Sequence, residues 1–491
     1  MTVIRHAQIH SVASARRAFA VSMGKAVRDG SRRLGKGSGS AFPGAVALAI
    51  DPGMLAGLAS EIPQGAVLVT GSNGKGTTCR LLAGVMRAAG LRPILNREGS
   101  NQLSGLATTM VASSGRFGHL PADDRAIGLF EVDEGSFPGI VGQIGRPRAL
   151  VFTNVFRDQL DRYMEPAYLT SMLERAMQAL PADTALVLNA DDPRVAYLAP
   201  DMENPRLFFG IGDTGLARDG ADPTSDFPRC PRCGSELAYR CVFYAHLGHW
   251  SCHHCGLARP EPQVKLTKIE LLGSASSRVW AATPTAEVLL EVPLPGLYNA
   301  YNAAAAIAAA SACQMPARAV LAIERVTPSS LRMERIKVTD HDVYLTLAKN
   351  ANGYTEVLRA VLADGRPKRF MLGLNDFEGK QPDTSWIWDV DFESVCGLIP
   401  SPVVTGNRAY DLTVRLKYAG WLGATKETTL TTEPDPVRAF QRALARTPAG
   451  EPLWLVSTSI VLQQVRRWLR QQGFVKEVWQ EQDQLAGTVQ R

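Results

Sequence analysis

The sequence predicts an α/β protein in which a phosphate-loop domain is interrupted by a four-cysteine ribbon and followed by a smaller α/β domain. Three observations support this prediction. A glycine-rich loop stands between an apolar strand and a helical stretch, two C-x-x-C pairs occur close together downstream, and strand-like and helix-like stretches alternate toward the end. At 491 residues the chain is also too long for one ordinary core.

The first 42 residues predict a basic helical segment. Arginine and lysine outnumber acidic residues eight to one before Asp51, and Ala15, Phe19 and Met23 recur at four-residue spacing. The helix either packs on the first domain, or it is drawn to an anionic membrane surface or an anionic substrate. The N-terminus has no long apolar core, and the Ala-rich run of residues 303–313 is too short to span a membrane, so we expect neither a signal peptide nor a membrane span.

A phosphate-binding loop is the strongest local signal. The apolar run "GAVLV" (65–69) predicts a buried parallel strand, "TGSNGKGTT" follows it, and "CRLLAGVMRAAG" has helical spacing. Strand, glycine-rich turn and helix are the context that such a loop requires, since backbone amides and the helix N-terminus then face the phosphates.

Individual residues of this loop have predictable roles. Lys75 would meet the β- and γ-phosphates, and Thr77 or Thr78 would offer a hydroxyl to Mg²⁺. The loop departs from the general G-x-x-x-x-G-K-[ST] pattern, because Val69 replaces its first glycine and Gly76 follows the lysine. The residues predicted to bind the nucleotide are Gly71, Ser72, Asn73, Gly74, Lys75, Gly76, Thr77 and Thr78.

This shortened loop resembles that of the Mur ligase superfamily, which includes folylpolyglutamate synthases. Those enzymes use ATP to convert a carboxylate into an acyl phosphate, which an amine attacks. Further segments follow in the superfamily's order: "LFEVDEGSF", "VFTNVFRDQLDRY", "LVLNADDPRV" and "PGLYNAYNAAAA". The resemblance implies that Glu131 binds Mg²⁺, with Asp133 as a further candidate ligand, and that Asn299 and Asn302 lie near the adenine. Gln159 replaces a histidine of the superfamily's pattern.

The two C-x-x-C pairs predict a structural zinc site within an insertion of about residues 226–260. Four thiolates, from Cys230, Cys233, Cys252 and Cys255, would close a tetrahedral shell and leave no position for a substrate. An iron site or a redox pair is the alternative. A glycine follows the second cysteine of each pair, where a tight knuckle often needs positive φ. The neighbouring histidines and Cys241 are expected to be surface or packing residues.

The combination of ligase domain and ribbon is similar to the MurT family, the ligase subunits of lipid II isoglutaminyl synthase. The resemblance extends over nearly the whole chain and includes "CPRCGSELAYRCVFYAHLGHWSCHHCG" and "SLRMERI". It implies ATP, Mg²⁺ and Zn²⁺ as cofactors, and it places Arg332 at the nucleotide. It also implies a role in peptidoglycan synthesis, in which ammonia amidates the α-carboxylate of D-isoglutamate in lipid II.

The resemblance further implies a heterodimer with a GatD-type glutaminase, because the chain has no G-x-C-x-G nucleophile elbow of its own. The expected location is the cytoplasm, at the inner face of the membrane if the basic N-terminus contacts lipid. Two alternatives stay open at this point. One is an amino-acid ligase such as a folylpolyglutamate or poly-γ-glutamate synthase, and the other is a nucleic-acid-binding ATPase with a zinc ribbon, although no nucleic acid is expected.

The C-terminal stretch predicts a second parallel sheet, from the strands "RFMLGL", "SPVVTG" and "PLWLVS" and the helices between them. Functional residues should follow strand ends, where Asn375, Asp376, Thr405 and Ser457 stand. The segments "LAKNANGYTEVLRAV", "LNDFEGKQPDTSWIWDVDFE" and "VTGNRAYDLTVRLKYAG" resemble the MurT C-terminal domain, with residues 379–382 and 457–459 departing from its pattern.

Asp383 is predicted to complete the partner's active site as the acid that orients a glutaminase histidine. The MurT resemblance implies this role, and Asp389 is the second choice. Alternatively, Asp383 caps a helix N-terminus. Trp386 and Trp388 suit core packing or a protein interface.

The predicted domains are residues 1–42, 43–328 and 329–491. The predicted catalytic residues are Lys75, Glu131 and Asp383.

Overall fold

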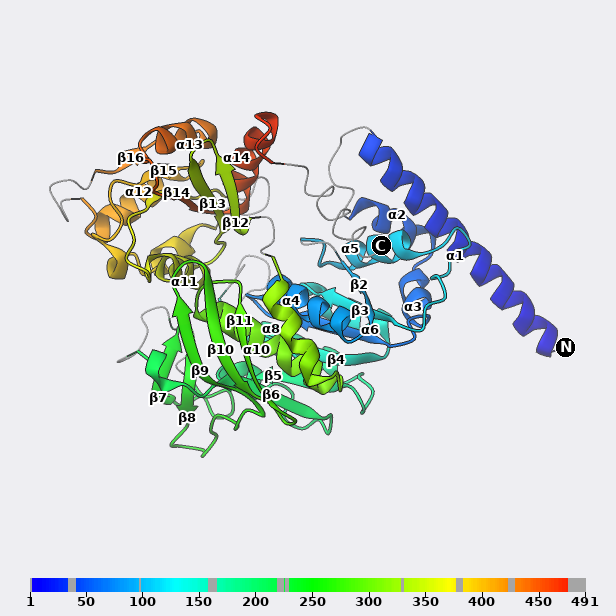
Figure 1. Cartoon of the computed structure of the whole chain (residues 1–491). Helices are drawn as coiled ribbons and strands as arrows, with labels where there is room; N and C mark the ends of the chain where they lie inside the picture. Colours follow the sequence, from blue (N-terminus) through cyan, green and yellow to red (C-terminus); the bar gives the residue numbers. More distant parts are fainter. Residues whose placement is uncertain are drawn as a thin grey trace.

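The computed structural model describes residues 2–33, 41–96, 99–157, 166–218, 225, 229–327, 331–376, 383–422 and 429–475. Gln159 and the altered segment 379–382 therefore lie outside the described residues. Figure 1 shows the C-terminal sheet and its helices above the larger sheet, with the N-terminal helix α1 on the opposite side of the molecule from the β7–β8 hairpin.

A nine-stranded sheet organises the first part of the chain, in the order β11-β10-β9-β6-β5-β4-β1-β3-β2. Strands β2 to β6 run parallel with β1 and β9, while β10 and β11 add an antiparallel edge. The strands are β1 (Ala66–Thr70), β2 (Arg92–Leu95), β3 (Ala126–Glu131), β4 (Pro147–Phe152), β5 (Ala185–Asn189), β6 (Arg206–Ile211), β9 (Val264–Leu272), β10 (Ser276–Ala282) and β11 (Glu287–Val292).

Helices cover both faces of this sheet, and each face has its own apolar core. One core contains α4 (Lys75–Ala88), α10 (Leu297–Ala312) and η3 (Ala317–Arg325). The other contains α2 (Phe42–Ile50), α3 (Met54–Ala59), α5 (Leu103–Ser113), α6 (Phe137–Ile144) and α8 (Pro166–Met177). Because strands β1, β3 and β4 are buried on both sides, they are mostly apolar rather than alternating, with polar residues only at the ends of β1 and β3 and at Arg148 of β4.

Helix α1 (Thr2–Arg33) packs on α2, but not through the stripe that its sequence suggests. Ala20, Val21 and Gly24 are buried, whereas Phe19 is 59% exposed and Met23 37% exposed. The contact selects small residues because a Cβ on Gly24 would lie 3.1 Å from the carbonyl oxygen of Pro43. Among the described residues, no helix has the length and apolar character needed to cross a bilayer.

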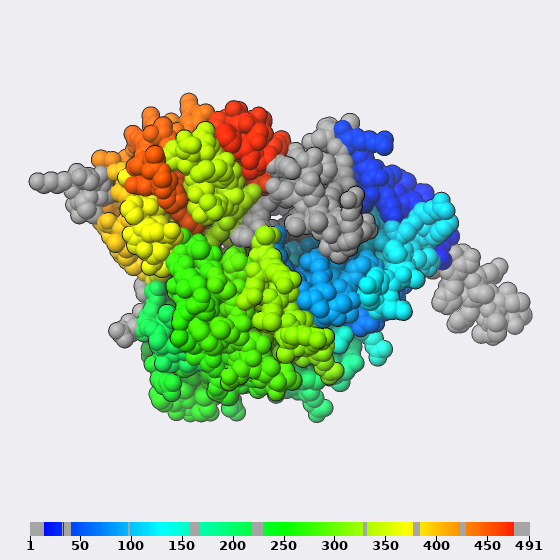
Figure 2. Space-filling model, viewed as in Figure 1, coloured from blue at the N-terminus to red at the C-terminus, as the bar shows by residue number. Residues whose placement is uncertain are grey.

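The C-terminal sheet has six strands in the order β12-β13-β17-β14-β15-β16, with β12 antiparallel and the others parallel. Its elements are β12 (Arg332–Val338), β13 (His341–Leu347), α11 (Ala351–Leu362), β14 (Arg369–Gly373), η4 (Ser385–Asp389), η5 (Glu393–Val395), β15 (Val403–Thr405), α12 (Ala409–Tyr418), β16 (Thr431–Thr432), α13 (Pro436–Ala445), β17 (Leu453–Ser457) and α14 (Ser459–Gln471). The predicted second α/β sheet is confirmed. In Figure 2 this part, yellow to red, rests on the green middle of the chain.

The ribbon is a two-stranded hairpin, β7 (Ala238–Tyr244) and β8 (Leu247–Ser251), with the cysteine pairs on either side. The short elements η1 (Glu134–Ser136), α9 (Pro193–Ala196) and η2 (Thr214–Leu216) complete the described structure. Trp250 donates its indole N–H to the carbonyl oxygen of Ala190 at 3.0 Å, which ties the hairpin to the end of β5. The insertion is therefore packed into the ligase domain instead of standing apart from it.

Candidate nucleotide and metal sites

The glycine-rich loop lies at the carboxyl edge of the large sheet, between β1 and α4, as the sequence predicts. Gly71 and Gly74 have φ values of 126° and 87°, which side-chain-bearing residues rarely adopt. Space also requires glycine at the second position, because a Cβ on Gly74 would lie 2.0 Å from Oδ1 of Asn302 on α10. The loop therefore adopts a backbone conformation that needs glycine, and helix α10 packs closely against it.

Residues 153–156, which follow β4, hold the loop in place. The Ser72 amide donates to the carbonyl oxygen of Asn154 at 2.9 Å, and the Asn73 amide donates to Oδ1 of Asn154 at 2.8 Å. The Phe156 amide donates to Oγ of Ser72 at 2.9 Å. We call residues 153–156 the support loop. Because its bonds reach both backbone and side chain of the glycine-rich loop, the support loop fixes the position of that loop.

Lys75 is buried at the start of α4 and forms an ion pair that sequence reasoning did not predict. Its Nζ lies 3.1 Å from Oε1 of Glu134 and 2.5 Å from the carbonyl oxygen of Gly71. Glu131, at the end of β3, is also buried, and its Oε1 accepts a hydrogen bond from Nδ2 of Asn101 at 3.0 Å. Asp133 caps η1 by accepting from the Gly135 amide. One buried lysine and several buried carboxylates therefore lie beside the glycine-rich loop. Such a mixture of charges suits the binding of a phosphate together with Mg²⁺.

The two threonines after Lys75 have different environments. Thr77 lines a cleft, whereas Thr78 is fully buried. Its Oγ1 has no hydrogen-bond partner among the described residues. Of the two alternatives that the sequence left open, Thr77 is the one that lines the cleft.

An open cleft runs from this loop to the C-terminal domain. The predicted residues Asn299, Asn302 and Arg332 all line it, together with Asn73 and Gly74. Sequence reasoning did not single out several others for this role. These are Tyr244, Leu294, Met333, Asn352 and Glu356.

The two domains meet beside this cleft through a pair of amide side chains. Nδ2 of Asn350 donates to Oδ1 of Asn73 at 3.0 Å, and Asn350 also caps α11 by accepting from the Gly353 amide at 2.8 Å. The phosphate loop therefore touches the C-terminal domain directly. No local sequence pattern predicts this contact of Asn350, because its partner Asn73 is 277 residues away in the chain.

The acidic residues after β5 are structural. Asp191 is fully buried and accepts from the Tyr301 hydroxyl at 2.7 Å and from Nε of Arg259 at 2.5 Å. Asp192 caps α9 by accepting from the amides of Arg194 and Val195. Asn189 donates to the carbonyl oxygen of Thr153 in the support loop at 2.9 Å. These side chains organise the sheet edge and do not face the cleft as ligands.

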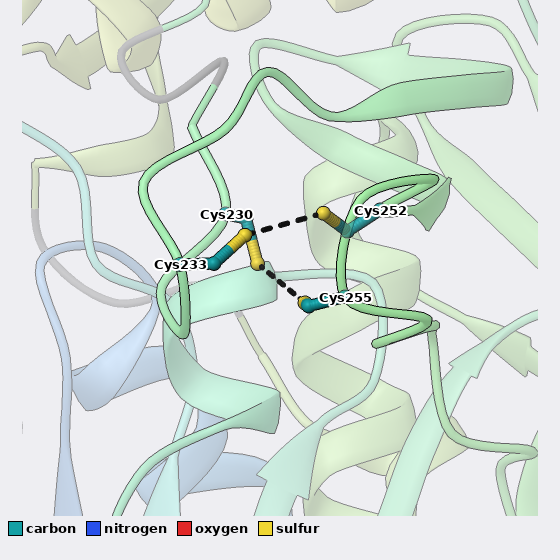
Figure 3. A group of neighbouring side chains, drawn as sticks. All are labelled: Cys230, Cys233, Cys252 and Cys255. Atoms are coloured by element: carbon teal, nitrogen blue, oxygen red, sulfur yellow. Dashed lines mark hydrogen bonds between the residues drawn. The ribbon is translucent and has the colours of Figure 1, made fainter.

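The four predicted cysteines come together, as Figure 3 shows. Cys230 Sγ lies 3.6 Å from Cys255 Sγ, Cys233 Sγ lies 3.5 Å from Cys252 Sγ, and all four sulfur atoms are within 4.8 Å of one another. Among the described residues, no histidine or carboxylate joins this group. Of the nearby histidines, His246 is fully buried and His249 partly buried, whereas His253 and His254 are exposed.

Each cysteine pair sits on a similar backbone knuckle. The Gly234 amide donates to the Cys230 carbonyl oxygen at 2.9 Å, and the Gly256 amide donates to that of Cys252 at 3.0 Å. Both glycines have positive φ, 75° and 73°, as the sequence predicts. Four sulfur atoms converging from two such knuckles fit a tetrahedral Zn²⁺, which would supply a structural crosslink and no reaction step.

The thiols of the cluster have unequal acidities. Hydrogen bonds with Ser235 lower the pKa of the Cys233 thiol to about 5, whereas burial raises the pKa of Cys230. One sulfur is thus readily ionised while another resists ionisation unless a cation compensates its charge.

Asn375 and Asp376, two of the four predicted strand-end residues of the C-terminal domain, contact residues that follow the neighbouring strands β15 and β17. The Asn375 amide donates to Oγ1 of Thr458 at 3.0 Å, and Oδ1 of Asn375 accepts from the Asn407 amide at 3.0 Å. Asp376 pairs with Nε of Arg408 at 3.0 Å. These contacts cross the carboxyl edges of β14, β15 and β17, where functional residues were expected.

Asp383 is exposed, and its Oδ1 accepts from the Ser385 amide at 2.8 Å at the start of η4. The N-cap of η4 is Thr384 and no side chain caps this helix, so Asp383 forms a local turn rather than the helix cap of the alternative prediction, and its exposed carboxylate is accessible from outside. Asp389, at the end of η4, is exposed as well. Trp386 packs partly into the core, whereas Trp388 is 49% exposed.

Family models match two regions of the chain: residues 69–224 match the Mur ligase middle domain, and residues 347–458 match the MurT ligase C-terminal domain. The chain is 33% identical, over 79% of its length and 84% of the relative's, to the lipid II isoglutaminyl synthase (glutamine-hydrolyzing) subunit MurT of Streptococcus pneumoniae. The chain belongs to the MurT family. The Staphylococcus aureus MurT subunit is 30% identical, over 82% of this chain and 87% of the relative.

Solved structures agree with this assignment at the level of fold. A pseudomurein peptide ligase type C from Methanothermus fervidus has a TM-score of 0.61 at 20% identity, with 83% of this chain and 78% of that chain covered. MurF ligase from Thermotoga maritima in complex with ADP has a TM-score of 0.58 at 12% identity, covering 84% of this chain and 82% of that one. This MurT-family protein is thus an ATP-dependent ligase with the Mur ligase fold.

Proposed function

We propose that this MurT-family ligase amidates the α-carboxylate of D-isoglutamate in the stem peptide of lipid II, giving D-isoglutamine. The carboxylate attacks the γ-phosphorus of ATP, forms an acyl phosphate and releases ADP. Ammonia then adds to the acyl carbon and phosphate leaves. The names of the relatives, lipid II isoglutaminyl synthase subunits, carry this proposal, and the cleft beside the glycine-rich loop supports it.

In this proposal the chain's own residues position phosphate and metal. Lys75 exchanges its partner Glu134 for phosphate oxygens, and Thr77 and Glu131 hold Mg²⁺. Asn299, Asn302 and Arg332 line the part of the cleft assigned to the rest of the nucleotide. The reaction needs charge neutralisation and alignment, not a covalent enzyme intermediate.

Ammonia must come from a partner, because no cysteine of the chain has the environment of a glutaminase nucleophile. Four form the cluster, Cys79 and Cys313 are buried, and Cys396 packs against the apolar core of the C-terminal domain. Burial raises the pKa of Cys241, although His249 stands opposite it in the hairpin. A nucleophilic cysteine requires the opposite shift, toward the thiolate. We therefore propose a heterodimer with a glutaminase subunit.

The C-terminal domain, proposed to extend over residues 329–491, offers a surface for that subunit. Tyr410, Val414 and Tyr418 lie one turn apart on α12 and are 66%, 44% and 74% exposed. The ring of Trp388 on η4 contacts that of Tyr418, with centroids 5.9 Å apart. We call these four residues the α12 patch. Exposed aromatic side chains of this kind are typical of interface hot spots, and Asp383 lies at the start of the same η4.

Reconstitution tests the proposed reaction. The purified chain should convert lipid II to its D-isoglutamine form with Mg²⁺, ATP and ammonium chloride, and with glutamine only when the glutaminase subunit is added. ATP turnover with free glutamate and tetrahydrofolate, without lipid II, would instead support the folylpolyglutamate-type alternative.

Co-sedimentation with anionic vesicles is a separate measurement. It shows whether the exposed Phe19 and Met23 also contact the membrane at the cytoplasmic face.

We also propose that the four cysteines bind one structural Zn²⁺ per chain. Cys252→Ser should release the metal and lower the thermal midpoint by roughly 10 °C, because a lost metal site is among the most destabilising changes. Metal analysis and a melting curve measure both effects. Cys396→Ser is the matched control, since this thiol lies outside the cluster and should leave zinc content unchanged. Full zinc occupancy in Cys252→Ser would contradict the proposal.

A further inference from the structure

The β7–β8 hairpin connects the cysteine cluster with the nucleotide cleft. One cysteine pair precedes β7 and the other follows β8, so the cluster lies at the open end of the hairpin. The tip lies at the other end, where Ala245, His246 and Leu247 are buried and Tyr244 lines the cleft. A single rigid element therefore reaches both sites.

The hairpin tip contacts the support loop behind the phosphate loop. His246 has no solvent exposure, and its Nε2 lies 3.2 Å from Oδ2 of Asp192. The same Oδ2 accepts a hydrogen bond from the Val155 amide at 2.8 Å. The His246 ring also meets the Phe156 ring edge-on, with centroids 5.0 Å apart. His246 thus contacts the Phe156 ring directly and lies beside the Asp192 carboxylate that accepts from the Val155 amide.

The support loop in turn holds the phosphate loop of the proposed nucleotide site in position through hydrogen bonds. Phe156 donates its amide to Oγ of Ser72, and Asn154 accepts from the amides of Ser72 and Asn73. Displacing residues 155–156 would therefore displace Ser72 and Asn73 of the phosphate loop. An error of about 1 Å in such a position is costly for binding and catalysis.

We propose that His246 is a positioning residue for the nucleotide, and that the hairpin couples the cysteine cluster to the phosphate loop. The inference rests on the nucleotide site proposed above. Metal at the open end and nucleotide beyond the tip both stabilise the same placement of the hairpin. Such coupling is reciprocal, so each ligand tightens the binding of the other.

The first test measures nucleotide affinity in the zinc-loaded protein by calorimetry with Mg²⁺ and a non-hydrolysable ATP analogue. His246→Ala should raise the Kd about tenfold, equivalent to about 1.4 kcal/mol. His246→Gln should restore much of the affinity, because its amide group can hydrogen-bond Asp192. His254→Ala is the matched control, since His254 is exposed between the cysteines of the second knuckle.

A purely structural role for His246 predicts a different result. The melting temperature without nucleotide would fall, while the folded protein would keep its wild-type Kd. That outcome, or an equal Kd for the alanine and glutamine variants, would overturn the assignment of His246. If the wild-type protein itself fails to bind the analogue, the proposed nucleotide site fails instead, which keeps the two proposals distinguishable.

The second test measures coupling through metal release. In the wild-type protein, saturating ATP analogue should slow the transfer of zinc to a chromogenic chelator about tenfold, which again corresponds to about 1.4 kcal/mol of coupling. In His246→Ala, a nucleotide concentration that still saturates the site should slow release much less. Equal release rates with and without nucleotide in wild-type protein that binds the analogue would overturn the coupling.

Discussion

Lys75→Ala is expected to reduce amidation roughly 100- to 1000-fold, the loss typical when one group that stabilises transition-state charge is removed. The side chain is buried in the phosphate loop, and in the proposed mechanism it binds the transferred phosphoryl group. The measurement is ADP release with lipid II, Mg²⁺, ATP and ammonium chloride. Near wild-type turnover would show that the nucleotide site is misplaced.

The ion pair of Lys75 determines the control for this experiment. Glu134 is buried, and removing its partner at 3.1 Å leaves a less compensated negative charge, which destabilises the fold. The double variant Lys75→Ala/Glu134→Gln removes that charge. It should regain stability in a melting curve but not regain turnover. Recovery of turnover in the double variant would mean that Lys75 acts only by neutralising Glu134.

Asp383→Asn is expected to reduce glutamine hydrolysis by the heterodimer roughly 10³- to 10⁴-fold, as for the acid that orients the histidine of a catalytic triad. The carboxylate is exposed and therefore accessible to a partner. Amidation with ammonium chloride should survive, because the substitution leaves the nucleotide cleft unchanged. Glutamate release and ammonia-driven amidation, measured side by side, separate the two activities.

A second variant separates chemistry from docking. Tyr418→Glu places a charge on the α12 patch and should prevent the complex from forming, whereas Asp383→Asn should leave complex formation intact. Size-exclusion chromatography of each variant with the glutaminase distinguishes them. If Asp383→Asn hydrolyses glutamine normally in the complex, the local contact with the Ser385 amide is its main role, and Asp389 becomes the acid to test.

Local patterns in the amino-acid sequence determine much of this protein by themselves. The strand, the glycine-rich turn and the helix around Lys75 are contiguous in the chain, so their order predicts their geometry. The same holds for the cysteine knuckles, where a glycine after each pair adopts positive φ. Such features depend on backbone conformation within a few residues, which the sequence reports directly.

Contacts between distant segments were decided only by the tertiary structure. The pairing of Lys75 with Glu134, the burial of Thr78 and the meeting of Asn73 with Asn350 all depend on how strands and domains pack. Helix α1 illustrates the same limit, since Phe19 belongs to a regular apolar stripe and yet faces solvent. Periodicity gives the spacing of side chains on a helix, but the shape of the surface opposite selects the face that packs.

The ribbon depends both on local sequence patterns and on contacts between distant segments. Four cysteines at this spacing determine that a metal-type cluster can form, because each C-x-x-C turn presents two sulfur atoms by itself. That the hairpin tip enters the ligase core, with His246 against Asp192, follows from packing across the sheet edge and from no local signal. The sequence thus determined the chemistry of each motif, and the tertiary structure decided which motifs act on one another, because burial brings together groups that the chain keeps far apart.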